Sequence, residues 1–154
     1  MPASGHTLGL TGLRERLLAL LPKGPIADVL HEGRRYFVDP AVTGAWIVTL
    51  PEILPITECL ELAEGLAEHD TPVGGIVVNR VLPDPFTPAE REVLAPFADR
   101  PWFGMERYRR APVADRALEL LRQRTDLPIE TVRELPLQGA ALVDAVAASL
   151  GGAP

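Results

Sequence analysis

The sequence predicts an α/β protein whose parallel sheet has about three strands flanked by helices. Two short apolar runs, at residues 45–50 and 73–78, are rich in β-branched residues and indicate buried strands. Between them, apolar residues recur every three or four positions from Pro55 to Ala67, which predicts a helix with one apolar face. Because two parallel strands need a crossover of this kind, residues 45–79 are interpreted as one strand–helix–strand unit.

The two predicted strands of this unit show no polar alternation, so we expect both of their faces to be covered. The first strand stops at Pro51, and the second ends on the polar pair Asn79 and Arg80. Ligands of open α/β sheets bind outside the carboxyl ends of the strands. Pro51, Glu52, Asn79 and Arg80 therefore mark the expected position of a binding site.

Helix and turn signals precede this unit. Leucines along residues 8–21 predict one helix, and residues 26–37 predict a second, shorter one. Asp39-Pro40 predicts a turn that leads into the first strand.

The elements after residue 80 begin with a strong helix start. Residues 87–90 (Thr-Pro-Ala-Glu) supply an N-cap, a proline in the first turn and a capping glutamate, and the helix is expected to reach about Phe97. A second helix is predicted over 113–125. Residues 129–135 alternate apolar and charged side chains, which predicts a third strand that is half-buried or at an edge. Residues 141–150 predict a closing alanine-rich helix.

Composition bounds the class of protein. With 154 residues, 47% of them hydrophobic, the chain can form one domain with its own core, and no linker or repeat divides it. Fifteen basic against 21 acidic residues give a net charge of −6, which argues against nucleic acid as a partner. The single cysteine excludes an internal disulfide framework and favours the cytoplasm. No run approaches the roughly 20 apolar residues of a membrane span.

Several common catalytic motifs are absent from the sequence. It contains no glycine-rich phosphate loop with a lysine, no Cys-x-x-Cys or His-x-x-x-His spacing for a metal, and no Gly-x-Ser-x-Gly elbow. Cys59 lies on the apolar face of the predicted crossover helix, which favours core packing. We therefore expect no catalytic and no metal-binding residue in this chain.

Four stretches have both a structural and a functional interpretation. Residues 2–8 are either a ragged terminus or a flexible loop that meets an anion before a helix. Asn79 is either a turn residue or an amide that offers a donor and an acceptor to a purine. Residues 135–137 (Leu-Pro-Leu) either stop a strand or line an adenine pocket. The basic and aromatic stretch 102–110 is either a surface with buried aromatic anchors or, as the minority interpretation, a partner-binding face.

Five of these motifs, in this order and spacing, resemble the arsenite-pump-driving (ArsA) ATPase family, which includes the targeting ATPase for tail-anchored membrane proteins. The motifs are Met1-Pro2-Ala3-Ser4-Gly5-His6-Thr7-Leu8, Asp39-Pro40, Val48-Thr49-Leu50-Pro51-Glu52, Val77-Val78-Asn79-Arg80-Val81 and Leu135-Pro136-Leu137. Each motif is weak by itself, whereas the ordered set is specific. The resemblance covers nearly the whole chain.

The resemblance implies a partial P-loop NTPase fold of the deviant Walker A type, and a nucleotide-switched dimer that uses ATP and Mg²⁺. Pro2, Ala3, Ser4, Gly5 and His6 look like the remainder of the Asp-x-Pro-x-Ser/Thr-Gly-His switch loop, which senses the γ-phosphate and magnesium. Asn79, followed by Arg80, matches the asparagine that reads the adenine. Pro136 and Leu137 match the loop that closes over the base.

The chain departs from the family where the phosphate chemistry should be. The phosphate loop, the first switch with its catalytic aspartate and the aspartate that opens the second switch have no counterpart in these residues. We expect a fragment or a late start of a longer gene, with a natural half-protein as the alternative. A single cysteine argues against arsenite pumping, and the zinc-binding cysteine pair of the eukaryotic targeting ATPases is missing.

The expected function is that of the C-terminal part of an ArsA-like ATPase. Its complete form would couple ATP hydrolysis to a dimer conformational cycle on a client such as a membrane protein, whereas this chain alone would be inactive and bind no cofactor. The alternative is a non-catalytic partner subunit of a separate ArsA-like ATPase, in a homo- or hetero-dimer. A third interpretation, an unrelated flavodoxin-like binding module, would need a phosphate loop after its first strand, and the sequence shows none there. Because the missing half of the family fold would supply the neighbouring parallel strands, the sheet of this chain is expected to leave an apolar edge uncovered, which favours aggregation.

Overall fold

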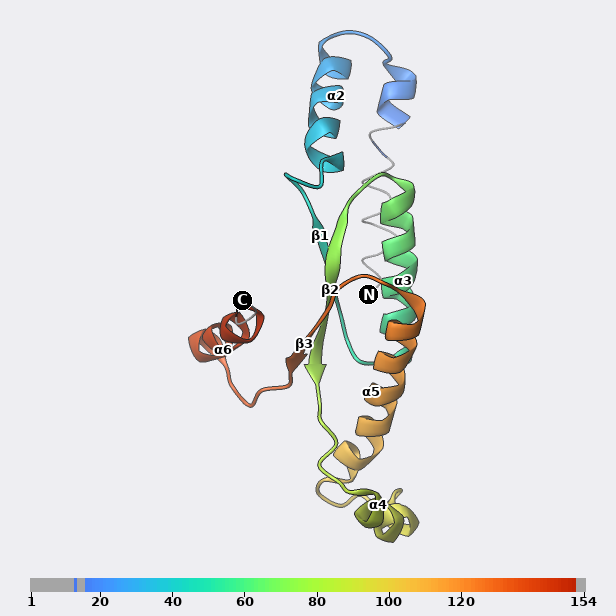
Figure 1. Ribbon diagram of the computed structural model, residues 1–154, viewed down its shortest axis with the longest axis vertical. Coiled ribbons are helices and arrows are strands. Elements are labelled where there is room, and N and C mark those ends of the chain that lie inside the picture. The colour runs from blue at the N-terminus through green and yellow to red at the C-terminus, as the bar shows by residue number, and fades with distance from the viewer. Residues whose placement is uncertain (1–12, 14–15, 152–154) are drawn as a thin grey trace.

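The computed structural model describes residues 13 and 16–151, and its centre is a three-stranded sheet in the order β1-β2-β3 (Figure 1). The strands are β1 (Ala45–Thr49), β2 (Val73–Val81) and β3 (Ile129–Arg133), and both pairings are parallel. The predicted α/β class and the three-stranded parallel sheet are confirmed. Pro2, Ala3, Ser4, Gly5 and His6 lie outside the described residues.

Helices make up most of the rest of the described chain, and their order agrees with the prediction. They are α2 (Pro25–Val38), α3 (Ile53–Glu68), α4 (Pro88–Leu94) with the 3₁₀ turn η1 (Ala95–Phe97), α5 (Met105–Arg124) and α6 (Gly139–Gly151). Residues 16–20 are helical as well. The predicted capping box opens α4, because Thr87 accepts from the Glu90 backbone N–H and Glu90 accepts from the Thr87 backbone N–H.

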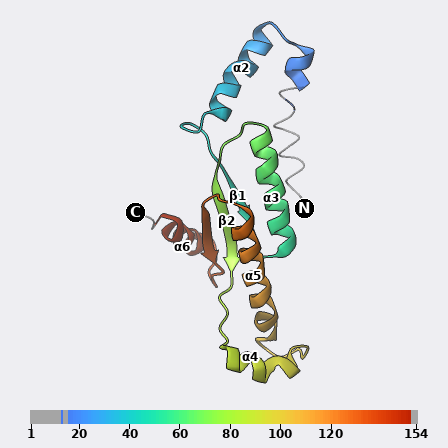
Figure 2. The same cartoon turned by 45° about the vertical axis from the view of Figure 1, so that its right-hand side comes forward.

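The hydrophobic core lies between the sheet and the pair α3 and α5. Figures 1 and 2 show these two helices on one side of the sheet and α6 on the other, beside β3. Ile47, Ile76 and Val78 of the sheet meet the apolar faces of both helices. The buried core members on the helices are Ile56, Cys59, Leu60, Leu66, Ala117, Leu118 and Leu121. The crossover helix therefore packs as its periodicity predicted.

Cys59 is a core residue, as predicted, and burial raises the pKa of its thiol to about 11. Because only the thiolate attacks a disulfide reagent, we expect very slow labelling at pH 8, where about one thiol in a thousand would be ionised. Labelling should accelerate as the pH rises toward 11, or in urea. A burst of labelling in native buffer at pH 8 would contradict this.

The expectation that both faces of β1 are covered is wrong. Ile47 and Thr49 are buried under the helices, whereas the Trp46 and Val48 side chains are 53% and 66% exposed. The reason is that α3 and α5 cover only one face, and α6 packs beside β3. An apolar strand sequence thus faces water on one side.

Trp46 lies flat on the two glycines of β2. A Cβ atom at Gly75 would come within 2.6 Å of the Trp46 ring and 2.9 Å of the Pro128 carbonyl oxygen, and a Cβ at Gly74 within 3.0 Å of the ring. Glycine at these positions allows the close approach of the indole and of the neighbouring backbone.

Two boundaries also differ from the prediction. Asn79 and Arg80 lie within β2 rather than after its end, because the strand continues through an irregularity to Val81, which pairs with Arg133. Helix α5 begins at Met105 instead of Val113. It runs through Pro112, whose missing N–H would otherwise bond to the carbonyl of Tyr108, and Arg91 donates to that carbonyl instead (Nη1 to O, 3.1 Å).

Candidate functional site

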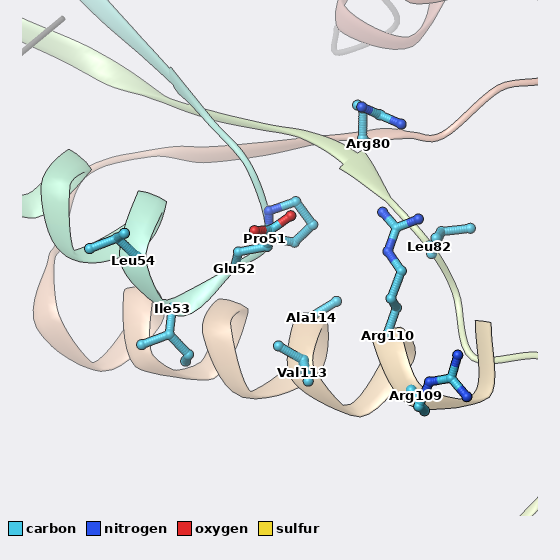
Figure 3. Close-up of a pocket in the computed structure, with 10 residues that line it drawn as sticks. All are labelled: Pro51, Glu52, Ile53, Leu54, Arg80, Leu82, Arg109, Arg110, Val113 and Ala114. Carbon is cyan, nitrogen blue, oxygen red and sulfur yellow. The ribbon is translucent and has the colours of Figure 1, made fainter. Parts of the chain in front are cut away.

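A cavity of about 500 Å³ opens at the carboxyl ends of β1 and β2, the position expected for a ligand in a parallel sheet (Figure 3). Its walls come from the start of α3, the end of β2 and the middle of α5. The lining residues are Pro51, Glu52, Ile53, Leu54, Arg80, Leu82, Arg109, Arg110, Val113 and Ala114. Three guanidinium groups therefore share one cavity with an apolar wall.

Arg80 stands on an unusual piece of backbone. Its φ is +60°, a value that side-chain-bearing residues seldom adopt, and it lies where the register of β2 against β3 shifts between Val78 and Val81. The Asn79 side-chain oxygen accepts a hydrogen bond from the Arg80 backbone N–H at 2.9 Å. This bulge turns Arg80 out of the regular alternation of the strand.

Glu134, just after β3, forms ion pairs with two of the three arginines, Arg80 and Arg110. It accepts a hydrogen bond from Arg80 Nη2 at 2.8 Å and lies 3.8 Å from Arg110 Nη1, which also lies 3.7 Å from Glu106. The hydrogen bond from Arg80, followed by the charges of Arg80 and Arg110, keeps the pKa of Glu134 below its ordinary range. Glu134 is thus an anion at neutral pH and neutralises part of the local positive charge.

Two arginines of α5, Arg109 and Arg110, line the cavity although consecutive helical residues point in different directions. Arg110 extends toward β2, and Arg109 lies further along the helix, where its Nη1 donates to the Ala98 carbonyl at 2.7 Å (Figure 3). The facing wall is formed by Ile53 and Leu54. Guanidinium groups beside apolar side chains suit a ligand that joins an anionic group to an apolar or aromatic part.

The sequence-predicted nucleotide residues are divided between two strands: Asn79 and Arg80 lie near the end of β2, and Pro136 and Leu137 follow β3. The Glu134 backbone N–H donates to the Val81 carbonyl at 3.0 Å, which holds the end of β3 beside the end of β2; Pro136 and Leu137 follow two and three residues later. Arg80 lines the cavity, whereas Asn79, Pro136 and Leu137 do not. Asn79 is half-buried, and both Pro136 and Leu137 are exposed.

Sequence reasoning missed Glu134 and did not assign Arg109 and Arg110 to this site. Glu134 fell inside the predicted strand 129–135, whereas the structure ends β3 at Arg133 and leaves Glu134 directly after it. The two arginines were seen only as part of a basic and aromatic stretch, since the helix that carries them was expected to begin after Pro112.

Among residues 13 and 16–151, no group of three or more His, Cys, Asp or Glu side chains could hold a metal ion. Within the same residues, no helix has the length and apolar character needed to cross a membrane.

Comparison with known proteins relates the chain to ATPases. The ATPase BagA of Mycobacterium tuberculosis (strain ATCC 25618 / H37Rv) is 36% identical over 89 residues, which make up 58% of this chain and 26% of BagA. A Mycobacterium bovis protein whose name also contains the word ATPase matches with the same identity and the same coverage. No family model matches the chain. The match thus spans about a quarter of the length of these curated relatives.

Proposed function

We propose that this chain supplies the adenine-side part of the nucleotide site of an ArsA-like ATPase, whose complete form couples ATP binding and hydrolysis to a dimer conformational cycle. The observation that carries the proposal is the 36% identity to proteins named as ATPases. It is supported by the bulge at Asn79 and Arg80, which lies where parallel sheets bind nucleotides. In this assignment, Asn79 reads the base, and Pro136 and Leu137 cover it.

In this proposal the chain contributes to binding the adenine base, whereas the hydrolysis of ATP depends on residues that it does not contain. Phosphoryl transfer depends on a phosphate loop, its lysine and Mg²⁺, which position the phosphates and neutralise their developing charge. The 154 residues contain no glycine-rich loop with a lysine. In this proposal ATP and Mg²⁺ are cofactors of the complete ATPase, which forms a homo- or hetero-dimer with an ArsA-like ATPase and acts on a client such as a membrane protein.

We expect the purified chain to bind adenine nucleotides only weakly and at a defined place. Base contacts alone must offset the cost of association, so the dissociation constant should be about 1 mM or weaker. Titration of ¹⁵N-labelled protein with ATP should shift the backbone amide signals of Asn79, Arg80 and Leu137. GTP is the matched control ligand, and Asn79→Ala is the matched variant.

Three outcomes would contradict the site assignment. They are equal shifts with GTP, shifts confined to residues remote from β2 and β3, and shifts that survive Asn79→Ala. The absence of turnover is tested separately by phosphate release. ATP hydrolysis that copurifies with the chain through successive columns, or a MgATP-induced thermal shift of several degrees that Asn79→Ala abolishes, would show that the chain binds phosphates without help.

A further inference from the structure

The cavity at the carboxyl ends of β1 and β2 has an apolar wall that the proposed adenine position does not use. The wall consists of three exposed side chains, Ile53 and Leu54 at the start of α3 and Val113 on α5. The lining side chains come mainly from α3, α5 and the end of β2, whose inner faces share one core. Apolar side chains beside a cavity of about 500 Å³ are typical of sites for small molecules.

Arg109 is the guanidinium of this cavity that is available to a ligand. Arg80 and Arg110 both pair with Glu134. Arg109 donates from Nη1 to the Ala98 carbonyl, and among the residues that the structure describes it has no carboxylate partner. Because a guanidinium carries five N–H donors in a planar fork, most donors of Arg109 remain for an anion.

The charges around the cavity fit a ligand with a single negative charge. Three guanidinium groups line it, and two carboxylates oppose them, since Glu52 also lines the cavity and Glu134 pairs with two of the arginines. The neighbouring charges of Glu106 and Arg107 on α5 balance each other. One positive charge is therefore left over, which suits a monoanion such as a carboxylate better than a polyphosphate.

The guanidinium and the apolar wall lie side by side on one helix. Arg109 and Val113 are one turn apart and so share a face of α5. In the view of Figure 3, Val113 lies between Arg109 and Ile53. A ligand that reaches from the guanidinium onto the wall therefore needs an apolar part of about 6 Å or more.

We propose that this cavity binds a small amphipathic monocarboxylate. Arg109 holds the carboxylate through charge-assisted hydrogen bonds, and the apolar chain or ring of the ligand covers the apolar wall. Both parts are needed, because the chain removes exposed apolar surface from water and the carboxylate neutralises the remaining charge. The site is separate from the adenine position, so the proposal does not depend on the nucleotide assignment.

Titration of the ¹⁵N-labelled full chain with octanoate tests the proposal. The backbone amide signals of Ile53, Arg109 and Val113 should shift together, with a dissociation constant of about 1 mM or tighter. Octanol is the matched ligand without the charge, and acetate is the matched ligand without the chain. Each should bind at least about tenfold more weakly than octanoate.

Arg109→Gln removes the charge and keeps a donor for the Ala98 carbonyl. It should raise the dissociation constant of octanoate about 10–100-fold, the loss expected for hydrogen bonds to a charged group. Arg122→Gln is the matched control, because Arg122 is an exposed arginine of the same helix that does not line this cavity. Its affinity for octanoate should equal that of the wild type.

A second pair of variants keeps the test decisive if Arg109→Gln does not fold. Val113→Glu places a carboxylate one turn from Arg109, at an exposed position, where it pairs with the guanidinium and repels the ligand. Octanoate binding should then be lost. Val113→Gln has the same shape without the charge and should retain more of the affinity than Val113→Glu.

The outcomes divide as follows. Octanoate binding that exceeds octanol and acetate binding, and that Arg109→Gln or Val113→Glu weakens, supports the proposal. Equal binding of octanol, or equal affinities of Val113→Glu and Val113→Gln, overturns it, as does the absence of shifts around the cavity. Displacement of octanoate by ATP would overturn the separation of this site from the nucleotide site.

Discussion

Arg91→Ala is expected to lower the free energy of unfolding by about 2–3 kcal/mol, a large effect for a residue outside the main core. Arg91 forms an ion pair with Asp84, and its guanidinium lies 4.6 Å from the centre of the Tyr108 ring. It also donates to the Tyr108 carbonyl that Pro112 leaves without its helical partner. The Tyr108 hydroxyl in turn donates to the Arg91 carbonyl at 2.9 Å.

Urea denaturation of a small set of variants separates these contributions. Arg116→Ala, on the exposed side of α5, is the control and should change stability by less than about 0.5 kcal/mol. In a Pro112→Ala background the helix supplies an N–H to the Tyr108 carbonyl, so removal of Arg91 should cost less than in the wild type. An equal cost in both backgrounds would show that the carbonyl contact contributes nothing.

The ion pair between Arg91 and Asp84 makes the stability of the folded chain depend on pH. The hydrogen bond from Arg91 lowers the pKa of Asp84 in the folded chain below its ordinary value of 3.8. A lowered carboxyl pKa contributes stability above the unfolded pKa, and that contribution is lost as the pH falls through the folded pKa. Asp84→Asn should therefore reduce the acid sensitivity of unfolding below about pH 4.

Gly75→Ala is the second change with a large expected effect, a loss of about 2–3 kcal/mol. The new Cβ atom would lie 2.9 Å from the Pro128 carbonyl oxygen, which accepts the Ile76 N–H at 2.8 Å. Backbone on both sides fixes that contact, so the β2–β3 pairing must shift. Thermal unfolding should show a melting temperature lower by roughly 5–10 °C.

Gly74→Ala is the matched control for this site. Its Cβ would meet only the Trp46 ring, at 3.0 Å, and that side chain is half-exposed and can move. The loss should therefore be well below that of Gly75→Ala. If Trp46→Ala restored the full stability of Gly75→Ala, the ring rather than the Pro128 carbonyl would be the cause.

The topology could be predicted because its signals are local. The crossover helix, the capping box at Thr87, the two apolar strands and the alternating third strand each depend on a few neighbouring residues. Which faces of a strand are covered depends instead on how distant helices pack against the sheet. The sequence of β1 is apolar throughout and gives no sign that one face is open, because this depends on where α3, α5 and α6 pack.

Only part of the site could be predicted, because some of its residues have a local signal in the sequence and others do not. Asn79 and Arg80 were found because polar residues follow an apolar run, although the bulge that holds Arg80 at φ +60° was not anticipated. Arg109 and Arg110 were not assigned, because Pro112 suggested a helix boundary. The helix continues through Pro112, and Arg91, distant in sequence, donates to the carbonyl that the proline leaves without its helical partner.

The placement of Trp46 gives the molecule an optical reporter. The chain has two tryptophans, and the other, Trp102, stacks on the Phe97 ring with centres 5.1 Å apart. In a Trp102→Phe background, all indole emission would come from the surface above Gly75. The emission wavelength of Trp46 would shift to the blue when a bound molecule excludes water from that surface. The fluorescence anisotropy would rise with the size of the complex.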